Sequence, residues 1–254
     1  MITKQQHSAD KAKEDTNQLV FSYLTLRNLI GLCGMLLPLV LAIFPTRPGP
    51  DDGFEPSISD YFYTDRGDVL VVLLSVLAVF LFTYTGYNWK ERALTLVAAL
   101  GGIGVAFVPT HAKCAGCTLS VHTSNGGIFH NRLEAMHLVF AGVFLLCLAI
   151  ISLVYFRRTD KVLRLPDGRL TQKGKRNVVY SICGWIMIAC VLILGLYFLL
   201  QRLINLDLKQ FPVIYFFETI AVEAFGISWL TKGETLWPDG QHYMVKALKR
   251  LISK

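Results

Sequence analysis

Residues 135–156 read AMHLVFAGVFLLCLAIISLVYF, an apolar run that contains one imidazole, His137, and no Asp, Glu, Lys or Arg. A helix rises about 1.5 Å per residue, so this run is long enough to cross a hydrocarbon core of roughly 30 Å. A helix on the surface of a soluble protein would carry a polar stripe, which this run lacks. The run therefore predicts a transmembrane helix.

Similar apolar runs recur along the whole chain. The sequence is 53% hydrophobic and 17% charged, with a mean hydropathy of +0.46, which is more apolar than a soluble domain of 254 residues can bury. We therefore predict an all-α fold, a polytopic membrane protein that forms a bundle of six transmembrane helices. The predicted spans are residues 22–44, 69–89, 93–110, 135–156, 177–201 and 211–231. In the third span, Gly101, Gly102 and Gly104 favour close contact with a neighbouring helix.

Basic residues predict the orientation of these spans. If the chain crosses six times, 19 of its 25 Lys and Arg residues fall on the side that holds both termini. Basic residues are retained in the cytoplasm, so both termini are predicted to be cytoplasmic and the protein to be a multi-pass protein of the cell membrane, typical of a bacterial inner membrane. This asymmetry accounts for the net charge of +7, and no nucleic-acid-binding motif accompanies it.

The segments outside the predicted spans differ in composition. Residues 1–20 are polar and predict a flexible cytoplasmic tail, residues 21–232 form the transmembrane domain, and residues 233–254 predict an amphipathic cytoplasmic tail. The basic segment 157–176 is expected to attract anionic lipid headgroups. Arg27, near the start of the first span, could reach the headgroups with its long side chain.

The first outer loop contains the aromatic stretch PSISDYFYTDRGD at residues 56–68. One interpretation is structural: Tyr61 and Tyr63 belong to the interfacial aromatic belt, and Asp68 caps the second span. The other is functional: Tyr61, Tyr63 and Arg66 form a lid over a site between the helices. Both interpretations remain open from the sequence.

This stretch resembles a family of uncharacterised bacterial six-span membrane proteins with a Ser-Ile-Ser-x-Tyr-x-Tyr-Thr segment before the second span. The other segments that carry the resemblance are FVPT at 107–110, HL at 137–138, RN at 176–177 with Tyr180, FGISWL at 225–230 and KGE at 232–234. In layout the chain is also remotely similar to DRAM-type autophagy modulators and to membrane proteins that remodel GPI lipids. These resemblances imply a six-helix fold and a connection with lipid, and they imply no particular reaction.

Two sets of residues could bind zinc. The second outer loop holds His111, Cys114, Cys117 and His122, a donor set that can complete a tetrahedral site, although Cys114 and Cys117 could instead form a disulfide or stay free.

His130, Glu134 and His137 form the second set, at positions i, i+4 and i+7 of one helical face, where they could ligate a metal or relay protons. Alternatively, His130 and Glu134 lie in the solvated approach to the fourth span. No cofactor is predicted beyond this zinc.

Glu218 and Glu223 place carboxylates inside the sixth span, where ionisable groups usually face the bundle interior. We predict that Glu218, His137 and Asp68 converge in the outer half of the bundle beneath the lid. The alternative is that Glu218 makes a structural hydrogen bond to another helix.

Three functions fit these features. The first is binding of a lipid or small amphiphile, or of a partner protein, in an outward-opening pocket. The second is a membrane-embedded, metal-dependent lipid hydrolase, and the third is a small proton-coupled transporter that uses Glu218, Glu223 and His137.

Overall fold

The computed structural model of this chain describes residues 2–43, 55–108, 110, 128–160, 162–204 and 212–238. Regular structure in these ranges is helical. The long helices are α1 (Ile2–Ile43), α2 (Gly67–Thr83), α3 (Trp89–Phe107), α4 (Ile128–Ile150), α5 (Gln172–Ile204) and α6 (Val213–Lys232). A short 3-10 helix, η1 (Ser59–Tyr63), precedes α2, and a π-helical turn, η2 (Ile151–Tyr155), continues α4.

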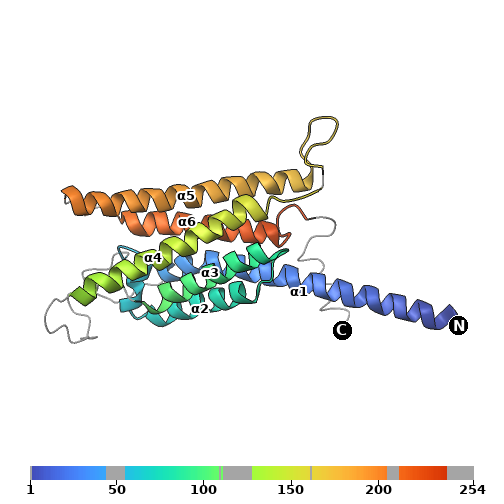
Figure 1. The fold of residues 1–254 in the computed structure, drawn as a ribbon, viewed down its shortest axis with the longest axis horizontal. Coiled ribbons are helices and arrows are strands. Elements are labelled where there is room, and N and C mark those ends of the chain that lie inside the picture. The colour runs from blue at the N-terminus through green and yellow to red at the C-terminus, as the bar shows by residue number, and fades with distance from the viewer. Residues whose placement is uncertain are drawn as a thin grey trace.

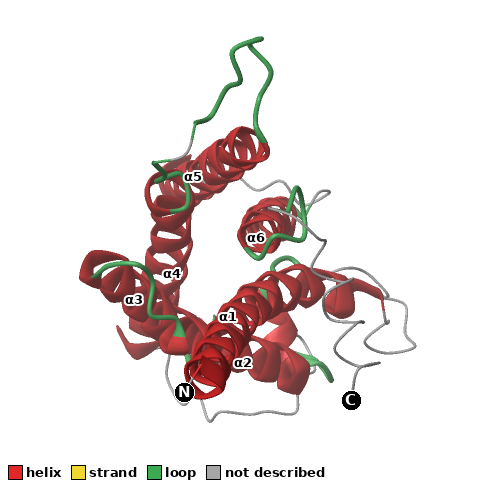
Figure 2. Ribbon diagram, turned by 90° about the vertical axis from the view of Figure 1, so that its right-hand side faces the viewer, coloured by secondary structure: helices red, strands yellow, loops and turns green. Residues whose placement is uncertain are grey.

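The six helices form a ring in chain order. Each helix packs against the next one along the chain, and α6 packs against both α5 and α1, which closes the ring. Figure 1 shows that the helices run along one common axis, and Figure 2 shows the ring from its end. Consecutive helices run in opposite directions (Figure 1). The connections after α1, α3 and α5 therefore lie at one end of the bundle, and those after α2 and α4 lie at the other.

Four helical segments are long and apolar enough to cross a membrane. They are Ser22–Ile43, Leu133–Tyr155, Gln172–Gln201 and Val213–Lys232. Helix α2 is equally apolar but shorter, and α3 has three charged residues in its first turn. Large apolar side chains also cover the outside of the bundle; Leu192 and Trp185 on α5 are 67% and 63% exposed. The protein is therefore a helical chain with the character of a membrane protein.

The helix bounds differ from the predicted spans at several ends. Residues 2–20, predicted as a flexible tail, continue α1 as helix, because Ala, Lys, Gln and Glu favour helix without needing tertiary contacts. Helix α2 ends at Thr83, six residues before the predicted end of the second span, and Gly86 then adopts φ of +65°. Helix α3 begins at Trp89, because the Asn88 side chain accepts a hydrogen bond from the Glu91 amide at 2.9 Å.

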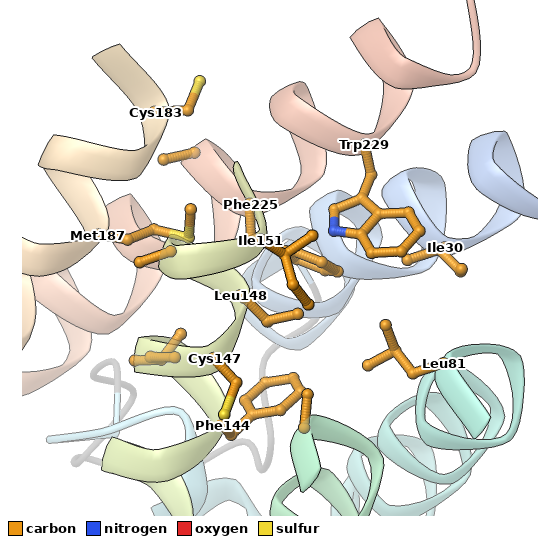
Figure 3. Close-up of a cluster of buried hydrophobic side chains, with 14 of the residues drawn as sticks. Ile30, Leu81, Phe144, Cys147, Leu148, Ile151, Cys183, Met187, Phe225 and Trp229 are labelled. Carbon is orange, nitrogen blue, oxygen red and sulfur yellow. The ribbon is translucent and has the colours of Figure 1, made fainter. Parts of the chain in front are cut away.

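Apolar side chains from all six long helices meet inside the ring. In Figure 3, Ile30, Leu81, Phe144, Met187 and Trp229 lie in one cluster, and each is buried. Lipid tails are as apolar as these side chains, so water exclusion contributes little to helix association inside a bilayer. Close packing and its dispersion energy therefore hold this cluster together.

Close packing is tightest where glycines face another helix. A Cβ atom on Gly104 of α3 would lie 2.3 Å from the Phe140 ring of α4, which confirms close contact at this predicted position. Gly31 of α1 and Gly226 of α6 face each other in the same way, and a Cβ on Gly31 would lie 2.8 Å from the Gly226 carbonyl oxygen. These contacts bring backbones together and fix the spacing of the ring.

Candidate functional site

A polar pocket of about 110 Å³ opens at the end of the bundle where α4 and α6 begin and α5 ends. We call it the polar pocket. Its polar lining comes from the segment before α2, from the chain after α3, and from α4, α5 and α6: Ser57, Ser59, Asp60, Thr110, Glu134, His137, Gln201 and Glu218. Helices distant in sequence therefore contribute to one site.

His137 is fixed at both ring nitrogens and is 3% exposed. Its Nδ1 lies 2.6 Å from the Val108 carbonyl oxygen, and its Nε2 lies 2.9 Å from Ser59 Oγ. A carbonyl oxygen can only accept, so Nδ1 carries a proton; in the neutral ring, Nε2 then accepts from the Ser59 hydroxyl. The imidazole thus joins the first turns of α4 to the end of α3 and to η1.

Glu218 holds the same segment from the other side. Its Oε2 accepts a hydrogen bond from the Ile58 amide at 2.7 Å, a short distance typical of a carboxylate acceptor. Nearby, the Tyr215 amide donates to the Pro56 carbonyl at 2.9 Å. Because Ile58 and Ser59 are adjacent, Glu218 and His137 bind consecutive residues of one segment.

Asp60 completes the polar wall. Its Oδ1 accepts from Thr110 Oγ1 at 3.0 Å, and its amide donates to Ser57 Oγ at 3.0 Å. The Tyr63 hydroxyl donates to the Thr110 carbonyl. These bonds connect the chain after α3 to the η1 segment, which therefore has a defined position over the pocket.

An apolar pocket of about 50 Å³ lies beside the polar pocket, inside the ring. Ser59 and Glu218 line both pockets. Apolar side chains from five helices and from the segment before η1 form most of its wall: Leu37, Ile58, Leu74, Leu77, Val105, Ala141, Phe144, Leu145, Val222 and Phe225. The polar pocket and the apolar pocket therefore share two wall residues, Ser59 and Glu218.

The residues predicted as a lid fasten the segment and do not line the polar pocket. The Tyr61 ring is buried and packs against Tyr215, with the ring centroids 6.0 Å apart. Arg66 donates through its NH1 atom to the carbonyls of Val40 and Leu41, at 3.2 and 2.7 Å, and so ties the segment to the end of α1. Burial raises the pKa of the Tyr61 phenol.

Tyr63 and Asp68 also lie apart from the lining. Burial raises the pKa of the Tyr63 phenol, whose hydroxyl donates to the Thr110 carbonyl. Asp68 is exposed in the first turn of α2, where a negative charge interacts favourably with the helix dipole. Of the three residues predicted to converge, the structure brings His137 and Glu218 to one pocket and leaves Asp68 outside.

The metal-binding interpretation stays a prediction. Glu134 and His137 both line the polar pocket, but both nitrogens of His137 already have protein partners. His130 lies in α4, and its side chain is outside the described part of the chain. Among the side chains that the structure describes, no group of three or more His, Cys, Asp or Glu could hold a metal ion. The other predicted set lies wholly outside the described residues: His111, Cys114, Cys117 and His122.

Ser59, Asp60 and Thr110 were not singled out as site residues from the sequence. Ser59 and Asp60 lie outside the predicted spans, and Thr110 is the last residue of the third, so hydropathy gives no reason to choose them. The available signal is position: Ser59 and Asp60 lie within the aromatic stretch that carries the family resemblance, and Thr110 closes the FVPT segment. Comparison of the chain with family models, with curated proteins and with solved structures finds no match. Function is therefore argued from the site.

Proposed function

We propose that this protein binds a lipid or small amphiphile, with the headgroup in the polar pocket and the apolar chain in the apolar pocket. The observation that carries the proposal is that Ser59 and Glu218 line both pockets. A ligand that spans them would need a polar and an apolar end at close spacing, which is the definition of an amphiphile. Ligand pockets are commonly apolar, with a few polar groups that fix orientation.

The charges of the polar pocket favour a particular headgroup. Among the side chains that the structure describes, three carboxyl groups line it, from Asp60, Glu134 and Glu218, together with the imidazole of His137. Carboxylates accept hydrogen bonds and repel anions. The proposed headgroup is therefore an amine or a polyol.

The same proposal includes the topology. Six spans with cytoplasmic termini place the polar pocket at the outer face of the cell membrane, and the 19 of 25 basic residues on the opposite side support this orientation. Helix α2, with 17 residues, is at the short end of the range for a membrane span. The basic segment 157–176 would then lie at the inner surface and attract anionic lipid.

Lipid analysis of the purified protein tests the binding proposal. Ala141 lines the apolar pocket, so Ala141→Leu should fill it; Ala135→Leu makes the same change at an exposed position of the same helix. Native mass spectrometry should detect an amphiphile bound to the wild type and to Ala135→Leu, and at least fivefold less bound to Ala141→Leu at unchanged thermal stability. Equal occupancy in both variants, or no bound amphiphile in the wild type, contradicts the proposal.

One contact favours a second candidate function, acyl transfer or hydrolysis. Ser59 Oγ lies 2.9 Å from His137 Nε2, within reach for a serine nucleophile and its general base, and the Val108 carbonyl orients the imidazole. The Ile58 amide already donates to Glu218 and so cannot stabilise an oxyanion, which favours binding over catalysis.

A fluorophosphonate probe distinguishes the two functions. Covalent labelling of the wild type and of Ser57→Ala, with loss of labelling in Ser59→Ala, would establish a nucleophilic serine. An unlabelled wild type would exclude this second function and leave the binding proposal untouched.

A further inference from the structure

The opposite end of the bundle contains a cavity of about 240 Å³, more than twice the volume of the polar pocket. We call it the basic cavity. Side chains from α1, from the chain after η2, from α5 and from the end of α6 line it. Five of these are basic and one is acidic: Arg27, Arg158, Lys173, Arg176, Lys232 and Glu234.

Four of the five cations are buried. Arg27 and Arg176 are 5% exposed, and Lys173 and Lys232 are 9% exposed. Burying a charged group is unfavourable unless a counter-charge or hydrogen bonds replace its hydration, and neighbouring like charges make it more so. The cavity therefore gathers more positive charge than its own acidic group balances.

Protein partners satisfy two of these cations in part. Lys173 Nζ donates to the Phe156 carbonyl at 2.8 Å. Arg176 donates through its NH1 atom to the Trp237 carbonyl at 3.2 Å, and this nitrogen lies 3.9 Å from Glu234 Oε1. Carbonyl oxygens fix the position of these side chains without neutralising their charge.

The other two buried cations lie against aromatic rings. Arg27 donates through its NH2 atom to the hydroxyls of Tyr87 and Tyr84, at 3.1 and 3.4 Å, but its Nε is buried and has no hydrogen-bond partner among the described residues. Lys232 Nζ lies 5.0 Å from the ring centroids of Tyr87 and Phe156. Aromatic faces attract this ammonium but accept none of its protons in the ordinary way.

A buried carboxylate nearby does not remove the imbalance. Glu91 is 1% exposed, and its two oxygens accept hydrogen bonds from the Tyr84 hydroxyl and from the Tyr87 amide, both at 3.0 Å. Glu91 therefore orients the tyrosines that contact Arg27. Among the side chains that the structure describes, five basic groups line the cavity, against Glu234 in its lining and Glu91 nearby.

From this geometry we infer that the basic cavity binds a phosphate-bearing anion, held by Arg27, Arg158, Arg176, Lys173 and Lys232. Guanidinium groups match the oxygens of a phosphate with paired donors, and ammonium groups add point charges. The volume lies below the range of drug-sized pockets, so it suits a headgroup or a small polyphosphate. The anion could be a phospholipid headgroup or a soluble phosphate compound, and both present the same chemistry.

This inference is independent of the amphiphile proposed at the other end of the bundle. It also goes beyond general attraction of the basic segment 157–176 to a charged surface, because Arg27 and Lys232 lie outside that segment. A buried site of fixed geometry should bind with a defined stoichiometry, whereas a basic surface binds in proportion to charge density.

The test uses the full-length protein in an uncharged detergent, titrated calorimetrically with inorganic pyrophosphate, and in nanodiscs that contain phosphatidic acid. Lys232→Met removes one buried cation of the cavity. Lys175→Met removes the same charge from an exposed position of α5 that does not line the cavity.

We expect saturable binding of one phosphate-bearing anion, a loss of affinity of about tenfold or more in Lys232→Met, and less than a twofold change in Lys175→Met. Lys232→Met should also raise the thermal stability of the ligand-free protein, because repulsion between buried cations is relieved; a purely structural lysine would lower it.

Saturable binding of pyrophosphate assigns a soluble phosphate compound to the cavity, and saturation by phosphatidic acid alone assigns a lipid headgroup. The inference is overturned if neither probe saturates, or if the two lysine variants weaken binding equally.

Discussion

Gly31→Ala tests the closure of the helix ring, because the two pockets and the basic cavity all depend on the spacing of α1 and α6. A Cβ on Gly31 would lie 2.8 Å from the Gly226 oxygen and from the Leu230 nitrogen, both backbone atoms of α6. Ordinary contact for a Cβ begins at 3.4 Å, so the two helices would have to separate by about 0.6 Å. Overpacking of this kind costs about 1–3 kcal/mol.

The control is the same substitution where space is open. A Cβ on Gly142 of α4 would meet nothing within 4 Å. Alanine is favoured over glycine inside a helix by about 0.5–1 kcal/mol, so Gly142→Ala should be slightly stabilising. Gly31→Ala has the same gain in helix propensity, but overpacking outweighs it, and the variant should be about 1–2 kcal/mol less stable than the wild type. The free energy of unfolding in mixed micelles measures both. Equal stabilities would refute the proposed close approach of α1 and α6.

Two further predictions concern the segment before α2 and the topology. Arg66→Met removes the donors to the Val40 and Leu41 carbonyls and should lower the free energy of unfolding by about 2–3 kcal/mol in the same assay. Arg66→Lys should lower it by less. If the two variants lose the same stability, the two hydrogen bonds do not have this role. In a background whose six native cysteines are replaced by Ser, an impermeant thiol reagent should label Gly49→Cys but not Gly168→Cys in intact cells, and the reverse pattern would invert the topology.

Hydropathy alone predicted the helical class of the fold and the approximate place of each helix. Hydropathy did not predict the exact ends of the helices, because local hydrogen bonds determine them. The cap made by Asn88 begins α3 four residues before the predicted span. Hydropathy also gave no indication of the groups that surround Arg27. In the structure Arg27 is 5% exposed and contacts the rings of Tyr23, Tyr84 and Tyr87, because these aromatic residues surround it inside the bundle.

The residues of the candidate site were also predicted only in part. The sequence singled out His137 and Glu218, because ionisable groups within apolar runs are costly and therefore conspicuous. It could not select Ser59 as the partner of His137, since 78 positions separate them and a serine in a polar loop is unremarkable.

Hydropathy and helix length are properties of consecutive residues. The amino-acid sequence is therefore enough to show that this chain has helices suited to a membrane, and which of these helices carry charged residues. The tertiary structure decided which polar groups meet. The polar pocket and the basic cavity arise only when α6 packs against α1 and closes the ring. Contacts such as that between Asn28 and the Gly233 carbonyl join residues 205 positions apart, and no local pattern of side chains encodes such a distance.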